Sequence, residues 1–365
     1  MRIAQVTYSY QPIVGGADVW AQLLRRVCEA AGHEVAIYQR PMPDLDDPAV
    51  RVIRSPLSSV LGKRGEFWSL PLGLPRLRKE LAQYEVLVVH YPNYHRFLEW
   101  HSGTVLVSHG VFWDDRPSAL RNRIKKALAR RAYREATFVV ANDTFFLREV
   151  GEDVRPGAEP FTQVAPGRFF VPNCVDTRMF TRTEPHPDLR DGPLVLVPRN
   201  VYRNRGIHLA IEALGRCVEE LDGARMVVAG AESQPRYAAY CRRLAAQLGI
   251  SDRVHFIGPI PWEQMPAAYS AADLTVIPTI AGEGTSLSAL EAMACGTATV
   301  TTKVAGLADL PTIKSEPTAE ALAAAMVKAW RNRPAIAAEQ QQAVRSVYNL
   351  ENWRQAWLEI LQRLD

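Results

Sequence analysis

The stretch from Leu274 to Leu310 constrains the fold of this chain more than any other segment. It opens with a short apolar run, Leu274–Ile277, which ends at a proline, a residue that donates no hydrogen bond to a neighbouring strand. A loop, Thr279–Gly284, leads into residues with apolar side chains at helical spacing, and a second apolar run, Thr297–Thr301, follows. The pattern predicts a strand, a loop, a helix and a second strand.

The start of this predicted helix is suited to an anion. Thr285, Ser286 and Ser288 place hydroxyl groups where the first N–H groups of a helix need partners, and Gly284 and Leu287 flank them. Because the first turn also carries the positive end of the helix dipole, phosphate binds readily at such a position. A simple capping role is the alternative.

Two carboxylates frame this terminus. Glu283 precedes the predicted helix and Glu291 lies about two turns into it. Eight helical steps span about 12 Å, roughly the reach of a diphosphate with a sugar at one end and a ribose at the other. Carboxylates suit both ends because each accepts hydroxyl hydrogen bonds. Two ordinary surface glutamates would show the same spacing, so this motif alone does not distinguish a ligand site from a solvated helix face.

Composition limits the class of protein. A chain of 365 residues with 47% apolar residues is long enough for two domains. The net charge of +4 is too small to indicate nucleic acid as a partner. Five cysteines without a C-x-x-C pair are typical of a reducing compartment, and we find no signal peptide or transmembrane run. We therefore expect a cytoplasmic protein.

The first half alternates apolar runs with helical patterns, as in a parallel sheet. Predicted strands are Arg2–Tyr8, Val35–Tyr38, Val86–His90, Thr104–Ser108 and Phe138–Ala141. The first is followed by a loop with Gly15 and Gly16, where the backbone could approach a phosphate closely, although a generic turn would use the same residues. The loop is not G-x-G-x-x-G, which argues against a nicotinamide cofactor.

Three other features of this half bear on function. His109 directly follows a predicted strand, where it could bind a sugar hydroxyl or serve structure alone. Asp44-Leu45-Asp46 lies in a predicted loop, Pro41–Arg64, with no strand before it, so we do not assign it a metal. The predicted helix containing Arg121–Arg134 is strongly basic and could contact anionic lipid or form a solvated face.

The alternation restarts in the second half, after a polar segment. Predicted strands are Leu194–Val197, Met226–Ala229 and Val254–Ile257, of which the last two end at Gly230 and Gly258. Arg199 and Arg205 follow the first of them, and two guanidinium groups at this spacing could clamp a diphosphate.

These patterns predict an α/β protein of two Rossmann-like, doubly wound domains facing a cleft. We place the first domain at residues 1–176 and a linker at 177–193. The second domain covers 194–348, and residues 349–365 are predicted to form a C-terminal helix. The cleft would collect the loops that follow the strands.

At this level of detail the chain resembles a known family, the retaining GT-B glycosyltransferases of family 4 (glycosyl transferases group 1). The resemblance covers nearly the whole chain. It rests on PIVGG before the first helix, VSHG at Val107, VPNCVDTRMF at Val171, RNVYRNRG at Arg199 and EGTSLSALEAMACGTATV at Glu283.

The resemblance implies that the first domain, 1–176, is the acceptor side and the second, 194–348, the donor side, and that the C-terminal helix at 349–365 crosses back to the first domain. It also implies a role for each candidate residue. Glu283 would bind donor-sugar hydroxyls and Glu291 the ribose, while the N–H groups around Ser286 and Leu287 would bind the distal phosphate. Arg199 and Arg205 would neutralise the leaving diphosphate, and His109 would lie near the reacting carbon. Backbone contacts to the donor are implied for the glycines Gly15, Gly16, Gly230, Gly258 and Gly284, with Thr285 beside them.

The chain departs from the family pattern at several positions. Arg205 stands where the family usually has lysine, and Thr285-Ser286 replaces an aromatic–glycine pair, which makes the predicted sugar pocket more polar and smaller. Ala298 replaces a frequent proline and Ala305 a frequent glycine.

The implied activity is metal-independent, retaining transfer of a hexose from a UDP- or GDP-sugar to a hydroxyl acceptor, a glycan or a lipid-linked group, as in polysaccharide biosynthesis. It needs no cofactor. The Arg121–Arg134 helix would place the enzyme peripherally at the inner face of the membrane. A sugar-nucleotide epimerase or a phosphorylase on the same fold, or a non-catalytic protein that binds nucleotide sugars, remain the alternatives.

Overall fold

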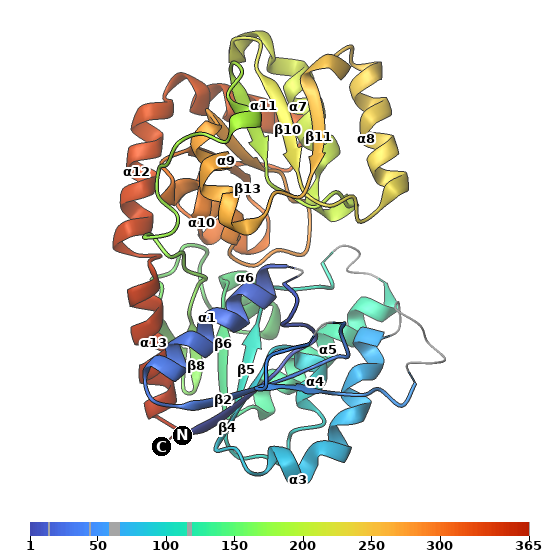
Figure 1. Ribbon diagram of the computed structural model, residues 1–365, viewed down its shortest axis with the longest axis vertical. Coiled ribbons are helices and arrows are strands. Elements are labelled where there is room, and N and C mark those ends of the chain that lie inside the picture. Colours follow the sequence, from blue (N-terminus) through green and yellow to red (C-terminus); the bar gives the residue numbers. More distant parts are fainter. Residues whose placement is uncertain (14, 44, 58–65, 115–118, 365) are drawn as a thin grey trace. The chain divides into compact units, whose positions relative to one another are not determined.

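The computed structural model describes residues 1–13, 15–43, 45–57, 66–114 and 119–364. Asp44, and with it the D-x-D sequence, lies outside the described residues. The chain divides into two compact units: unit 1 comprises Met1–Pro172 with Trp353–Asp365, and unit 2 comprises Asn173–Asn352. Each unit contains one sheet with helices packed on it (Figure 1). The two α/β sheets agree with the predicted fold class.

Unit 1 is built on an eight-stranded sheet in the order β3-β2-β1-β4-β5-β6-β8-β7, parallel except for the β7–β8 pair. The strands are β1 (Arg2–Val6), β2 (Glu34–Gln39), β3 (Val50–Val52), β4 (Val86–Val89), β5 (Thr104–Ser108), β6 (Phe138–Ala141), β7 (Thr162–Ala165) and β8 (Arg168–Phe170). The prediction that residues 41–64 form only loop was wrong at β3, a three-residue edge strand that pairs with β2.

The helices of unit 1 cover this sheet. They include α1 (Gly16–Ala30), α3 (Arg78–Leu81), α4 (Pro92–His95), α5 (Leu120–Glu135), α6 (Thr144–Val150) and, from Trp353 onward, α13 (Leu350–Gln362). Trp353 and Trp357 of α13 are fully buried against Trp20 of α1, with ring centroids 5.6 and 5.3 Å away. These two tryptophans hold the C-terminal helix on unit 1.

Unit 2 has a six-stranded, fully parallel sheet in the order β11-β10-β9-β12-β13-β14. The strands are β9 (Leu194–Val197), β10 (Arg225–Ala229), β11 (Val254–Gly258), β12 (Leu274–Ile277), β13 (Ala298–Thr302) and β14 (Ile313–Ser315). The helices are α7 (Ile207–Cys217), α8 (Pro235–Gln247), α9 (Met265–Ala271), α10 (Leu287–Ala294), α11 (Ala319–Arg331) and α12 (Arg333–Ser346).

The apolar strands of unit 2 are buried on both faces. In β9, Val195 and Val197 belong to the core under α7, α8 and α11, whereas Leu194 and Leu196 belong to the core under α9, α10 and α12. A strand covered by helices on both sides must be apolar throughout, which explains the uninterrupted runs in the sequence. The segment predicted as a linker packs into the second of these cores through Phe180 and Leu189.

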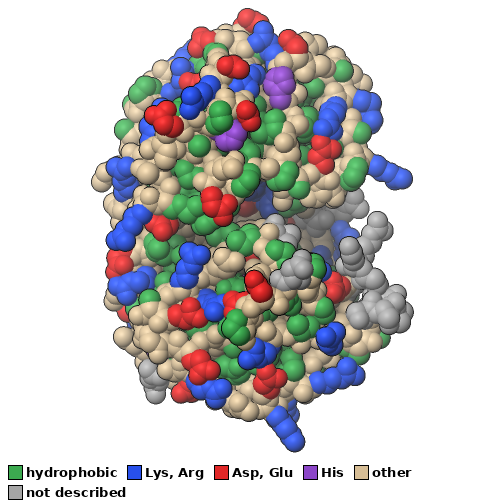
Figure 2. All heavy atoms as spheres, in the orientation of Figure 1, with side chains coloured by type: hydrophobic (Ala, Val, Ile, Leu, Met, Phe, Trp, Pro, Cys, Tyr) green, Lys and Arg blue, Asp and Glu red, His purple; other side chains and the backbone are tan. Residues whose placement is uncertain are grey.

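The surface is mixed in charge. Acidic and basic side chains are interspersed over the face drawn in Figure 2.

All five cysteines are buried and free. No described helix is long and apolar enough to cross a membrane.

Candidate functional site

The strand order of unit 2 places its candidate residues at one point of the sheet. The order reverses between β9 and β12, and in doubly wound sheets ligands bind beyond the carboxyl ends of the strands at such a reversal. Arg199 follows β9, and Thr279 and Glu283 follow β12. Because β9 and β12 are neighbours in the sheet, the polar side chains that follow these two strands meet here.

Arg199, Arg205 and Glu283 form a largely buried ion cluster. Both guanidinium groups donate to the same carboxylate oxygen of Glu283. The side chains of Arg199 and Glu283 are only 8% and 9% exposed, and that of Arg205 is 21% exposed. Burial and the neighbouring Arg205 lower the pKa of Arg199. Two cations against one carboxylate leave the cluster positive, so an anion is its natural additional partner.

A threonine that sequence reasoning missed completes this cluster. Arg199 Nη2 donates to Thr279 Oγ1 over 3.0 Å, and that hydroxyl donates to Glu283 over 3.1 Å. Arg199 Nε is buried and has no hydrogen-bond partner among the described residues. The first polar residue after a buried strand is the signal that could have identified Thr279.

The amino terminus of α10 lies beside the cluster. Its N-cap residue, Ser286, makes no side-chain capping bond and instead accepts from Arg199 Nη1 over 3.3 Å. The first-turn N–H groups of a helix have no partner within the helix. The predicted anion site at Ser286 and Leu287 therefore has its backbone donors beside two guanidinium groups.

Thr285 has a structural partner. Its hydroxyl accepts from the backbone N–H of Asn173 over 2.8 Å, and its carbonyl accepts from the Asn173 side chain. Gly284 and Thr285 are both buried. A contact from Thr285 to a donor sugar stays a prediction, and the bond to Asn173 shows what else fixes this loop.

Glu291 is buried in an aromatic pocket. It accepts from Tyr269 Oη over 2.8 Å and from Trp262 Nε1 over 3.3 Å, and burial raises its pKa. Sequence reasoning missed both of these partners. It also placed Glu291 too deep in the helix: α10 begins at Leu287, so Glu291 lies little more than one turn in. The 12 Å estimate does not apply, since the chain from Glu283 to Ser286 is not helical.

Two of the predicted glycines end strands of unit 2, and Gly206 lies between Arg205 and α7. Gly230 N–H donates to the Gly258 carbonyl over 2.8 Å. A Cβ at Gly230 would overlap the backbone carbonyl of Arg199, whereas the space around Gly258 is open and its φ is +76°. Gly206, with φ +68°, would place a Cβ on the Pro278 carbonyl. Close packing thus accounts for Gly230 and Gly206 before any ligand is considered.

In the sheet of unit 1 the strand order also reverses, between β1 and β4. The candidate glycines of this unit follow β1 in the sequence. Gly16 is the first residue of α1, and Gly15 precedes it in an extended conformation, with open space where a Cβ would be. Gly15 N–H donates to Asp18, and Ser9 donates to the same carboxylate over 2.7 Å.

His109, at the end of β5, is partly exposed and contacts a second histidine. Its Nε2 lies 3.0 Å from Nδ1 of His90, which follows β4. Burial lowers the pKa of His109 to about 4. Sequence reasoning treated His90 only as the end of a strand, although the strand-end rule that selected His109 applies to it equally.

The two groups of candidate residues belong to different units. Arg199, Arg205, Glu283, Ser286 and Leu287 are brought together within unit 2, with Glu291 one turn along the same helix. Gly15, Gly16 and His109 lie in unit 1. That they share a cleft stays a prediction.

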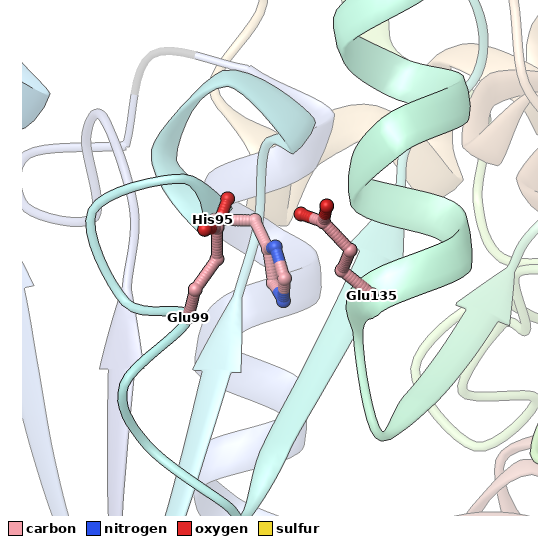
Figure 3. Close-up of side chains that lie close together, drawn as sticks. All are labelled: His95, Glu99 and Glu135. Atoms are coloured by element: carbon pink, nitrogen blue, oxygen red, sulfur yellow. The ribbon is translucent and has the colours of Figure 1, made fainter.

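One group of described side chains in unit 1 has the composition of a metal site. His95 of α4, Glu99 and Glu135 of α5 place ligand atoms within 4.8 Å of one another (Figure 3). Arg131, however, donates to Glu135 over 2.9 Å and to Glu99 over 3.2 Å. Because one guanidinium group already pairs with both carboxylates, the cluster is an ion-pair network beside a buried histidine.

Comparison with known proteins identifies the class. Solved structures of the same fold include sucrose-phosphate synthase from Thermosynechococcus elongatus, with a TM-score of 0.80 at 19% identity over 100% of this chain and 98% of that one. Anabaena HepE in complex with UDP-glucose has a TM-score of 0.74 at 18% identity over the full length of both chains. The fold is that of the GT-B glycosyltransferases.

Sequence comparison gives the family. The profile of Glycosyltransferase Family 4 matches residues 14–167, and that of Glycosyl transferases group 1 matches residues 182–345. The chain therefore belongs to the GT-B glycosyltransferases of family 4 (glycosyl transferases group 1).

Individual relatives agree with this assignment. A D-inositol 3-phosphate glycosyltransferase of Xylanimonas cellulosilytica is 27% identical over 354 residues, 84% of this chain and 81% of that protein. That of Mycolicibacterium smegmatis is 43% identical over 100 residues, 27% of this chain and 23% of that protein.

Proposed function

We propose that the protein transfers a sugar from a nucleotide-diphosphate sugar to a hydroxyl acceptor with retention of anomeric configuration and without a metal ion. The observation that carries the proposal is the positive cluster of Arg199, Arg205 and Glu283 beside the open amino terminus of α10. Two guanidinium groups and a helix terminus supply the positive charge that a leaving diphosphate requires.

In the proposed reaction, the bond between the anomeric carbon and the phosphate oxygen breaks, and the acceptor oxygen bonds to the same carbon. The acceptor proton passes to the departing phosphate oxygen. Glu283 is a poor nucleophile because both guanidinium groups already bind its carboxylate. This supports a route without a covalent enzyme intermediate, in which Glu283 accepts hydroxyl hydrogen bonds from the donor sugar.

The ligand classes follow from the same residues and from the relatives. HepE, a structure of the same fold, binds UDP-glucose, which supports a UDP-sugar donor, and a GDP-sugar is the second candidate. The buried Glu291 would accept ribose hydroxyls. The acceptor is a hydroxyl compound, a glycan or a lipid-linked group. Because of the names of the relatives, D-inositol 3-phosphate is one acceptor that should be tested.

We also propose peripheral contact with an anionic membrane through α5. Leu120 and Ile124 are 69% and 53% exposed one turn apart, and Arg121 and Arg123 beside them are exposed. Apolar side chains flanked by cations suit an anionic lipid surface. Co-sedimentation with anionic vesicles at low salt should weaken on Leu120→Ser with Ile124→Ser but not on Leu248→Ser in unit 2. Equal binding by the wild type, the double variant and the Leu248→Ser control would contradict this membrane contact.

The reaction is tested with the full chain, a panel of nucleotide sugars and hydroxyl acceptors. We expect release of nucleoside diphosphate that depends on the acceptor, and a product whose anomeric proton coupling matches that of the donor. Interconversion of the donor sugar would indicate the epimerase, inverted product would contradict retention, and binding without turnover would indicate a non-catalytic protein.

A further inference from the structure

Three polar side chains form a hydrogen-bonded chain inside unit 1. Gln5 lies in the middle of β1, His90 follows β4 and His109 follows β5. His90 Nε2 lies 2.9 Å from Gln5 Oε1, and His90 Nδ1 lies 3.0 Å from His109 Nε2. Gln5 and His90 are both completely buried, and neither has a role in the proposed reaction so far.

The backbone fixes which way the Gln5 amide faces. Its nitrogen lies 3.1 Å from the carbonyl oxygen of Ala21 in α1. A carbonyl oxygen only accepts, so the NH₂ group of Gln5 must face it and the amide oxygen must face His90. The reversed amide would set two oxygen atoms against each other.

The amide orientation then determines where both imidazole protons lie. The Gln5 oxygen only accepts, so His90 must carry its proton on Nε2. In a neutral ring this leaves His90 Nδ1 as an acceptor, and the proton between the two histidines must belong to His109 Nε2. His109 Nδ1 is then left with a lone pair.

This conclusion requires both histidines to be neutral, and burial lowers the pKa of His109 to about 4. A charged His90 would donate from both nitrogens and would force the opposite tautomer on His109. Burial, followed by the neighbouring His109, lowers the pKa of His90 well below its usual range. Both rings also pack against the ring of Trp20 in T-shaped arrangements, with centroids 5.2 and 5.0 Å away.

We propose that Gln5 and His90 are positioning residues that hold His109 as the Nε2–H tautomer, so that His109 Nδ1 accepts a hydrogen bond from a hydroxyl group of the ligand. No described residue is hydrogen-bonded to that nitrogen. The inference rests on the proposed function for the identity of the ligand, a sugar. A lone pair at this position excludes direct contact with a phosphate or carbonyl oxygen, because both only accept.

The tautomer can be measured without any substrate. In the full-length protein labelled with ¹⁵N-histidine, long-range nitrogen–proton spectra distinguish protonated from unprotonated ring nitrogens, and His109→Gln identifies the His109 signals. We expect an unprotonated Nδ1 and a protonated Nε2 at pH 7. A proton on Nδ1 of His109 would overturn the proposal.

Variants test the chain of cause. Gln5→Glu gives His90 a carboxylate that favours its charged form, so His109 should switch to the Nδ1–H tautomer. Gln5→Met removes the constraint and should give a mixture, with kcat/KM reduced in proportion to the remaining Nε2–H fraction, about twofold for an equal mixture. Gln83→Met, on an exposed loop of the same unit, is the matched control. An unchanged His109 spectrum in both folded Gln5 variants would contradict the mechanism.

The spectra and the kinetics fail separately. If wild-type protein shows the expected tautomer but turns over no sugar nucleotide, the proposed function is wrong and the proton assignment stands. If turnover occurs while His109 Nδ1 carries the proton, the proton assignment is wrong and the proposed function stands.

Discussion

Arg199 and Glu283, which follow two adjacent parallel strands of unit 2, form an ion pair with less than a tenth of either side chain exposed. Arg205 donates to the same carboxylate oxygen. Glu283 therefore has two functions in one position: it compensates two cations in the ligand-free protein, and in the proposed reaction it faces the donor sugar.

We predict that Glu283→Gln reduces turnover by about a hundredfold or more and also destabilises the fold. Removing one partner of a buried ion pair costs about 3–5 kcal/mol because the remaining charge is uncompensated. Denaturant unfolding measures this loss, and Glu316→Gln, on an exposed residue of unit 2, is the control. Inorganic diphosphate should stabilise the Glu283 variant more than the wild type. Equal losses in both variants would show that the cluster contributes nothing to stability.

Tyr269→Phe tests the proposed ribose contact of Glu291. The hydroxyl of Tyr269 donates to Glu291, and its loss should let the carboxylate move and raise the donor KM about tenfold while kcat changes little. Tyr237→Phe removes a comparable buried hydroxyl, bonded to His208, and should cost similar stability without changing KM. An increase of KM in both variants would point to a general loss of packing in unit 2.

Gly206→Ala should be far more damaging than Gly249→Ala, although the two glycines have nearly the same φ, +68° and +69°. Both changes strain the backbone by about 1 kcal/mol. Only the first also drives a Cβ into the Pro278 carbonyl. We expect a loss of about 3 kcal/mol or more for Gly206→Ala, together with reduced activity because Arg205 precedes it. Similar unfolding free energies for the two variants would contradict the close approach.

Lys314 should make the stability of the protein depend on pH. Its ammonium group is largely buried and donates to the Leu307 carbonyl over 2.6 Å and to Thr312 over 2.7 Å. Burial lowers its pKa to about 7, below the usual 10.5. Between these pH values the unfolded chain binds the extra proton, so stability rises with pH from about 7 to about 10.

The comparison with Lys314→Met isolates this effect. Wild-type stability relative to the variant should increase by a few kcal/mol over that interval, since one pKa unit corresponds to about 1.4 kcal/mol. Lys303→Met, on an exposed lysine directly after β13, should show no such trend. A constant gap between wild type and Lys314→Met would mean that Lys314 keeps its proton throughout.

Much of the fold could be predicted because its strands are buried on both faces. Runs such as Leu194–Val197 are apolar at every position, so their positions along the chain can be predicted from the sequence. The short strands β3, β7, β8 and β14 were not predicted, because each has only three or four residues and includes polar side chains. Short edge strands depend on pairing with a neighbour rather than on composition.

The candidate site was predictable where residues directly follow a strand, and less so elsewhere. Arg199 was found by that rule, whereas Glu283 was found because it precedes the predicted helix, and the structure brings the two together. The partners Asn173, Tyr269 and Gln5 come from distant parts of the chain, and only the tertiary fold places them. Gln5 did leave a trace in the sequence, since it is a polar residue inside an otherwise apolar buried strand.

Thermal unfolding of the purified protein with UDP-, GDP-, ADP- and dTDP-sugars, each with and without EDTA and followed by analysis of the released nucleotide, tests the central claim most directly. We predict that one nucleotide class raises the unfolding temperature and is turned over, that EDTA changes neither result, and that Glu283→Gln reduces the turnover by about a hundredfold or more. Stabilisation by none of the four, or turnover that requires an added metal ion, would contradict metal-independent transfer at the Arg199–Arg205–Glu283 cluster.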